Sequence, residues 1–199
     1  MKTIAAALFC LLASASLANA QTPTRIRGKI AAFDGEVLSV RTAAGKDLKV
    51  HLTPKTSISY PRLLKLADLK AGDYVGSAAM PGPDGKLVAR EVHVFPEAQR
   101  GVGEGHYPWD LQPGSTMTNG GVSKVVKAAN GQELTVQYKT GEKTIVVPAG
   151  VPVVTSVPGD RSLLVAGAYM FIGAQQAADG TLTAQYIQAT SKDGVKPPV

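Results

Sequence analysis

The chain has 199 residues, of which 44% are hydrophobic and 18% charged, and its formal net charge is +6 at pH 7. This composition is typical of a folded globular protein and excludes an intrinsically disordered one. The 21 glycines and 13 prolines separate many short segments rich in β-branched residues. That pattern predicts an all-β protein.

The first twenty residues have the features of a signal peptide. Lys2 is followed by an apolar run at residues 4–13, which is too short to span a bilayer, and residues 18–20 (Ala-Asn-Ala) fit a signal-peptidase site. We expect cleavage after Ala20 and a periplasmic or secreted protein without a transmembrane segment. Cys10, the only cysteine, lies in this signal. The mature chain is therefore expected to have no disulfide, thiol nucleophile or thiolate ligand.

Two stretches of the remaining chain resemble each other. Residues 26–52 can be laid over residues 122–148, so that Asp34-Gly35 falls on Asn130-Gly131 and alternating apolar positions coincide. After a one-residue gap the match resumes between residues 72–89 and residues 167–184, where Asp84-Gly85 falls on Asp179-Gly180. Turn glycines and apolar positions recurring in the same order predict an internal duplication. We expect a first unit at residues 21–95, an ordered Gly/Pro-rich connection at 96–121, a second unit at 122–190 and a flexible tail at 191–199.

Each unit is predicted to hold five strands. In the first unit a tight hairpin at Asp34-Gly35, of the kind that needs positive φ, joins the first two strands. Leu63, Leu66 and Leu69 have helical spacing and predict a short helix, with a weaker counterpart at residues 162–165. The expected strands of the first unit are residues 26–33, 37–42, 47–52, 74–80 and 87–95. This order predicts two tandem small OB-like five-stranded β-barrels, with a short helix in the first.

Three motifs in the first unit add a resemblance. They are G-x-I-x-x-x-D-G-x-x-L-x-V from Gly28, L-x-D-L-K-x-G-D-x-V from Leu66, and D-G-x-L-x-A-R-E-V from Asp84. This pattern resembles a bacterial envelope family of unknown function with OB-like repeats. The resemblance covers residues 26–95 well and residues 122–190 loosely. Because no activity and no catalytic residues are assigned to that family, the resemblance implies a fold and a compartment only.

Basic residues are concentrated in the first unit. Residues 25–95 hold twelve lysines and arginines against seven acidic residues, whereas residues 122–190 hold five against four. A basic face keeps a protein soluble or contacts anionic envelope material, and both interpretations stay open. Nucleic-acid binding is not expected, because the second and third strands carry no aromatic side chain on which bases would stack. The candidates for contact with an anionic surface are Arg27, Lys29, Arg41, Lys49 and Arg90.

Residues 104–121, EGHYPWDLQPGSTMTNGG, differ from the alternating sequence around them and hold the only tryptophan, Trp109. One interpretation is a clasp laid across both barrels with Trp109 as its anchor, held by the turns on either side. The other is a copper or zinc site, since His and Met together suit copper. One His and one Met eleven residues apart match no known ligand spacing, so the joint is favoured. The candidate residues for ligand binding or for the clasp are Glu104, His106, Tyr107, Trp109, Asp110 and Met117. The four that would serve as metal ligands are Glu104, His106, Asp110 and Met117.

No catalytic set can be assembled from the sequence. The histidines, His51, His93 and His106, are scattered, and alternation predicts that His93 lies at the surface. The GVGEG stretch at 101–105 lacks the helix that must follow a phosphate-binding loop. We therefore expect a non-enzymatic binding or interaction module without a cofactor. Its partner is left open between an anionic envelope polymer and another periplasmic protein, and a metal-binding protein that uses the central connection is the alternative.

Overall fold

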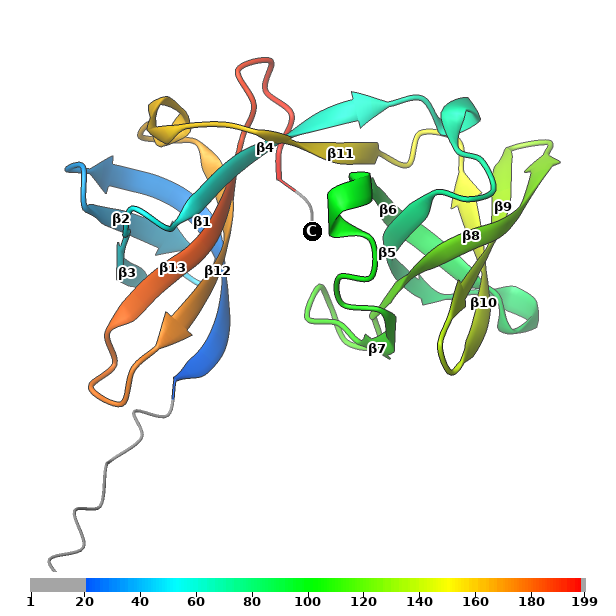
Figure 1. Cartoon of the computed structure of the whole chain (residues 1–199), viewed down its shortest axis with the longest axis horizontal. Coiled ribbons are helices and arrows are strands. Elements are labelled where there is room, and N and C mark those ends of the chain that lie inside the picture. The colour runs from blue at the N-terminus through cyan, green and yellow to red at the C-terminus, as the bar shows by residue number, and fades with distance from the viewer. Residues whose placement is uncertain (1–20, 198–199) are drawn as a thin grey trace, which may run out of the picture.

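The structure is a computed structural model that describes residues 21–197. The predicted signal peptide lies outside the described residues. The described chain is all-β: its strands are joined by turns and short 3₁₀ helices, and residues 21–197 contain no α-helix. Within the same range no helix has the length and apolar character needed to cross a membrane. The strands close into two five-stranded barrels (Figure 1).

Barrel 1 is closed by one parallel strand pair. β1–β2, β2–β3, β1–β12 and β12–β13 are antiparallel, and β3–β13 is the parallel pair that completes the ring. Leu38, Val50, Ile172 and Ile187 lie fully buried in its core, as expected for the inward positions of alternating strands. The strands are β1 (Thr22–Phe33), β2 (Val37–Thr42), β3 (Asp47–His51), β12 (Tyr169–Gln176) and β13 (Leu182–Ala189).

Barrel 2 has the same arrangement. β5–β6, β5–β8, β8–β9 and β9–β10 are antiparallel, and β6–β10 is the parallel closing pair. Val75, Val92, Leu134 and Ile145 form the centre of its core. A short extra strand, β7 (Gly105–Pro108), pairs with β8 outside the ring. The strands of the ring are β5 (Tyr74–Pro81), β6 (Leu87–Val94), β8 (Thr116–Ala128), β9 (Gly131–Tyr138) and β10 (Gly141–Pro148).

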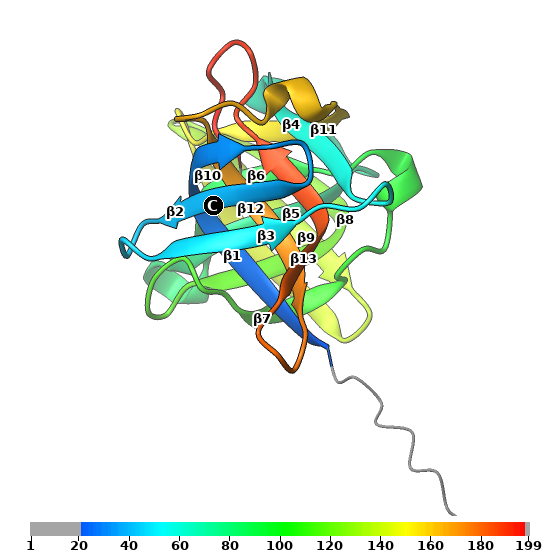
Figure 2. The ribbon, with the colours of Figure 1, turned by 90° about the vertical axis from the view of Figure 1, so that its left-hand side faces the viewer.

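Each barrel takes strands from both halves of the chain. Figure 1 shows the blue strands β1–β3 in one barrel with the orange and red β12 and β13, and Figure 2 looks onto this barrel. The expectation of one barrel from residues 21–95 and another from 122–190 is therefore wrong. β5 and β6 pair with β8 and β10 in barrel 2 instead of returning to β1 and β3.

The exchange depends on two strands that the sequence analysis missed. β4 (Ser57–Leu64) carries the chain from barrel 1 to barrel 2, and β11 (Val153–Pro158) carries it back. Eight extended residues span about 26 Å, which takes the chain from one barrel to the other. β4 and β11 pair antiparallel with each other, and each also pairs in parallel with a barrel strand, β13 or β6. They form a two-stranded bridge along one side of both barrels (Figure 1).

The two halves of the chain make the same set of strand pairs, but their register differs from the expected one. Leu38 faces Phe33 across the first hairpin, whereas Leu134 faces Val125 across the second. The second hairpin is therefore four residues longer, and Ile30 rather than Ile26 corresponds to Val122. An ungapped comparison across the turn could not detect this extra length.

The helix expected at residues 63–69 does not form. Leu63 lies near the end of β4 and is 56% exposed, and only η1 (Leu66–Asp68) makes a 3₁₀ turn. A spacing of three residues also fits a 3₁₀ helix, which explains the misleading pattern. In the second half η4 (Arg161–Leu163) takes the corresponding place. The other 3₁₀ helices are η2 (Pro83–Gly85) and η3 (Glu97–Gln99).

The expected connection at 96–121 and the expected tail at 191–199 both contain ordered structure. The connection at 96–121 is in part regular structure, because it contains β7 and the first six residues of β8. The tail expected to be flexible begins with a closed turn instead. There the Ser191 N–H donates to the Val195 carbonyl at 2.9 Å, and the Val195 N–H donates to the Ser191 hydroxyl at 3.0 Å.

Candidate ligand-binding site

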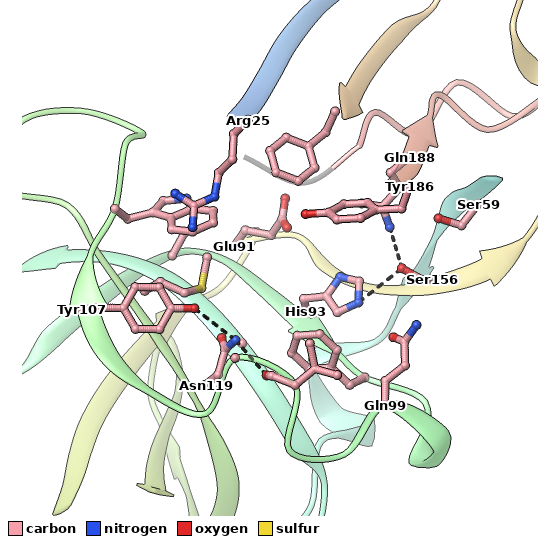
Figure 3. Close-up of a pocket in the computed structure, with 18 of the residues that line it drawn as sticks. Arg25, Ser59, Glu91, His93, Gln99, Tyr107, Asn119, Ser156, Tyr186 and Gln188 are labelled. Atoms are coloured by element: carbon pink, nitrogen blue, oxygen red, sulfur yellow. Dashed lines mark hydrogen bonds between the residues drawn. The ribbon is translucent and has the colours of Figure 1, made fainter. Parts of the chain in front are cut away.

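A pocket of about 430 Å³ lies between the two barrels, and we call it the inter-barrel pocket. Figure 3 shows side chains from both barrels and from the β4–β11 bridge pointing into it. Its volume is within the range of pockets that enclose small organic ligands. The lining residues used below are Arg25, Ser57, Ala78, Glu91, His93, Phe95, Tyr107, Trp109, Met117, Asn119, Ser156, Phe171, Tyr186 and Gln188.

Two equivalent β-bulges direct side chains into the pocket. The register of β5–β6 shifts between Ala78 and Ala79, and that of β12–β13 shifts between Gly173 and Ala174. A bulge adds one residue and reverses the inward–outward alternation beyond it. As a result Leu87 and Ala89 face the core of barrel 2 before the bulge and Val92 faces it afterwards. Glu91 and His93 on β6, like Tyr186 and Gln188 on β13, consequently face the pocket.

Two glycines give these side chains room. Gly173 is paired with Tyr186, and a Cβ on Gly173 would lie 2.2 Å from the tyrosine ring. Gly76 is paired with Asn119, and a Cβ there would lie 2.5 Å from the Asn119 amide oxygen. Because neither strand has a side chain at these points, the larger residue of each pair lies directly over the backbone.

Aromatic rings form a large part of the pocket wall. The centroids of Phe171 and Tyr186 are 6.0 Å apart, and those of Tyr107 and Trp109 are 6.2 Å apart. The ring planes in these pairs are tilted by 49° and 59°. Burial raises the pKa of Tyr107 and of Tyr186, so both phenols are neutral at physiological pH.

A hydrogen-bond chain joins the two barrels across the pocket. The Gln188 side-chain amide donates to the Ser156 hydroxyl at 2.5 Å, and the same hydroxyl lies 3.3 Å from Nε2 of His93 (Figure 3). A hydroxyl can donate one hydrogen bond and accept two, so Ser156 can either donate to Nε2 or accept from it, depending on which ring nitrogen of His93 carries the proton. Burial lowers the pKa of His93 to about 4, which agrees with a neutral ring. Alternation correctly placed His93 outside the barrel core, but the surface it occupies is the pocket wall.

Asn119 holds the opposite wall together. Its amide nitrogen donates to the Val102 carbonyl at 3.2 Å and to the Tyr107 hydroxyl at 3.4 Å. Its amide oxygen is buried and has no hydrogen-bond partner within the described chain. A buried carbonyl oxygen without a partner is uncommon in folded proteins.

The charges at the pocket are balanced. Arg25 and Glu91 line it, and Glu91 is only 7% exposed. In Figure 3 the hydroxyl end of Tyr186 points toward the Glu91 carboxylate. Just outside, Arg27 binds Asp110 through two hydrogen bonds of 2.9 and 3.0 Å. Burial alone would raise the pKa of Asp110, but its hydrogen bond to Arg27 makes the net change a lowering.

The loop after β7 positions Trp109. The backbone N–H of Trp109 donates to the backbone carbonyl of Ser115. The Ser115 hydroxyl lies 2.9 Å from the Trp109 carbonyl oxygen and 2.7 Å from the Gln112 carbonyl oxygen. The guanidinium carbons of Arg25 and Arg27 lie 4.4 and 5.6 Å from the indole centroid. Trp109 and Asp110 thus reach from barrel 2 to β1 of barrel 1. Trp109, expected as the anchor of a clasp across both barrels, is half-buried, and the groups of barrel 1 that lie over its ring are the guanidinium groups of Arg25 and Arg27.

The other residues predicted in the central segment divide between two faces. Tyr107 and Met117 form a strand pair and line the pocket. His106 lies on the opposite face of β7, where its ring stacks on Tyr138 and its Nδ1 lies 2.9 Å from the Thr118 hydroxyl. Glu104 accepts a hydrogen bond from the Lys139 N–H at 2.9 Å. The four proposed metal ligands are therefore not brought together, and residues 21–197 contain no group of three His, Cys, Asp or Glu that could hold a metal ion.

The predicted basic surface is also divided. Arg90 belongs to barrel 2, whereas the other four candidates lie on barrel 1. Arg27 is paired with Asp110, and Arg41 is paired with Asp47 at 2.8 Å. Lys29 lies over the ring of Tyr169, 4.8 Å from its centroid. Lys49 lies on β3.

Comparison with curated proteins and with solved structures finds no match for this chain. The comparison with protein families finds one for residues 27–93, from β1 to β6. The strands in this range contribute to both barrels, so the matched region does not form a closed barrel by itself here. A domain of unknown function, DUF5666, covers residues 27–93.

Proposed function

We propose that the protein is an exported, non-enzymatic binding module whose ligand occupies the inter-barrel pocket. The observation that carries this proposal is the pocket's composition. Tilted aromatic rings and uncharged hydrogen-bonding groups from both barrels enclose about 430 Å³. Binding is favoured over catalysis because the one hydroxyl–imidazole contact of the pocket, between Ser156 and His93, has a weak base: burial lowers the pKa of His93 to about 4.

The same proposal includes the origin and location of the protein. We infer that each barrel is OB-like and that the chain arose by tandem duplication. The support is the equivalent order of strands in the two rings, β1-β2-β3-β13-β12 and β8-β9-β10-β6-β5. Each ring is closed by a parallel pair, β3–β13 or β10–β6, and the same pairings occur in both halves. Export to the bacterial periplasm rests on the signal features of residues 1–20.

The first experiment is a thermal-shift screen of small molecules on the mature protein, residues 21–199. A ligand that binds the folded state raises the melting temperature, and at 100 times its dissociation constant it contributes about 2.7 kcal/mol. Hits should lose their effect in Ala78→Phe, because Ala78 lines the pocket and belongs to neither barrel core. Gln176→Leu, at the exposed end of β12, is the control. Hits that persist equally in Ala78→Phe would place binding elsewhere.

A second candidate is contact with anionic envelope material through barrel 1. Residues 21–56, which hold β1–β3, carry seven lysines and arginines against three acidic residues. Ionic contact with a polyanion should weaken steeply above physiological salt, where the screening length is about 8 Å. Binding that does not depend on salt, or no binding to any anionic polymer, would leave the charge a role in solubility only.

A further inference from the structure

We infer that the ligand of the inter-barrel pocket is a small neutral saccharide, an inference that rests on the binding function proposed above. It depends on three properties of the lining: its charge balance, the tilt of its aromatic rings, and its ring of uncharged hydrogen-bonding groups. Each property separates saccharides from another class of small molecule.

The charge balance argues against an ionic ligand. Arg25 and Glu91 place one basic and one acidic residue on the lining, and the neighbouring Arg27 and Asp110 pair with each other. The imidazole and both phenols of the lining are uncharged near neutral pH. A ligand with a net charge would lose hydration on entering, and the lining has no excess of residues of the opposite sign to offset that cost.

The tilt of the rings argues against a planar aromatic ligand. His93 and Phe95 are tilted by 59°, Tyr107 and Trp109 by 59°, and Phe171 and Tyr186 by 49°. A flat ligand is best held between parallel faces, which none of these pairs provides. A pyranose ring is puckered and has C–H groups on its faces, and these groups are attracted to the negative face of an aromatic ring.

The polar groups suit a ligand with many hydroxyls. Ser57, Asn119, Ser156, Gln188 and the two tyrosines present neutral donors and acceptors around the aromatic walls. Each sugar hydroxyl both donates and accepts, and amide and hydroxyl side chains do the same. A hydrocarbon-like ligand would leave most of these groups without partners at a cost in free energy.

The test uses the mature protein on an array of neutral, acidic and amino-substituted oligosaccharides. Calorimetry then compares the best array hits with two neutral aryl compounds, indole and benzamide, and with choline and benzoate. We expect neutral saccharides to bind and Gln188→Leu to weaken binding about tenfold, which corresponds to the loss of one hydrogen bond. Gln176→Leu should leave the affinity unchanged. Circular dichroism of each variant separates lost binding from lost folding.

Three results would overturn the inference, and they have different meanings. If indole, benzamide, choline or benzoate binds and loses affinity in Ala78→Phe while no saccharide does, the pocket is a binding site of another chemical class. The saccharide inference then fails and the proposed function stands. If neither the saccharides of the array nor the small molecules bind the pocket, the saccharide inference and the proposed binding function both fail. Acidic sugars binding better than neutral ones, with strong salt dependence, would assign the saccharide to the basic face of barrel 1.

Discussion

Arg27 on β1 and Asp110 after β7, 83 residues apart in the sequence, form a two-bond ion pair that connects barrel 1 to barrel 2. Their side chains are 28% and 46% exposed, so we expect a coupling free energy of no more than about 1 kcal/mol. A double-mutant cycle with Arg27→Gln and Asp110→Asn, followed by urea unfolding, measures it. Strictly additive effects of the two substitutions would show that the pair does not couple the barrels.

His93 makes stability depend on pH. Burial lowers its pKa from 6.5 in the unfolded chain to about 4, so between these values the unfolded state binds more protons than the folded state. Stability should therefore be complete above pH 6.5 and fall as the pH decreases toward 4, by at most about 3 kcal/mol from this group. His93→Gln should flatten this part of the profile.

His51→Ala is the matched control for that measurement, because His51 is exposed on β3. Burial also lowers the pKa of His106, which adds a loss of the same sign. The prediction therefore concerns the difference between the profiles of wild type and His93→Gln. If the two profiles are parallel between pH 4 and 6.5, His93 is not buried as described.

The strand exchange predicts that the two halves of the chain remain associated after a cut between them. Each half supplies three strands to one barrel and two to the other, so neither barrel closes without both. A protease site introduced at Gly101–Gly103, an exposed turn, should be cleaved without separating the halves in native gel filtration. Their separation into two folded pieces would favour one contiguous barrel per half.

Most of the strands could be predicted from the sequence, but their partners could not. Alternation identified β1–β3 and β5–β6, and turn glycines such as Gly35 marked the hairpins. The exchange was hidden because residues 57–64 contain a proline and two adjacent leucines and were not recognised as a strand. Whether β5 and β6 return to barrel 1 or enter barrel 2 depends on whether residues 57–64 form the extended strand β4.

One glycine in each barrel marks a close approach between neighbouring strands. A Cβ on Gly120 would lie 2.2 Å from the Gln137 carbonyl oxygen, and one on Gly28 would lie 2.3 Å from that of Arg41. We expect Gly28→Ala and Gly120→Ala each to cost about 1–3 kcal/mol in urea unfolding, as overpacking does. Gly121→Ala is the matched control, since its Cβ would meet no atom within 4 Å. Equal stability of Gly120→Ala and Gly121→Ala would contradict the close approach.

The candidate site was only half predictable. The unusual composition of residues 104–121 correctly drew attention to Tyr107, Trp109 and Met117, which line the pocket. Glu91, Tyr186 and Gln188 were missed because a bulge, invisible in the pattern, reverses the alternation of their strands. His93 was placed outside the barrel core, but nothing in the pattern showed that a pocket lies there. Ser156 was missed with β11. The pocket exists only where two barrels meet, and the sequence contains no direct signal of that contact.

The most direct test of the pocket as the binding site uses Trp109, because it lines the pocket and is the only tryptophan of the chain. A ligand found by thermal shift or calorimetry is titrated into wild type and into Ala78→Phe while the tryptophan emission is recorded. We predict a saturable change in wild type, with the dissociation constant found by the other method, and none in Ala78→Phe. A ligand that binds both proteins equally and leaves Trp109 emission unchanged would contradict the account.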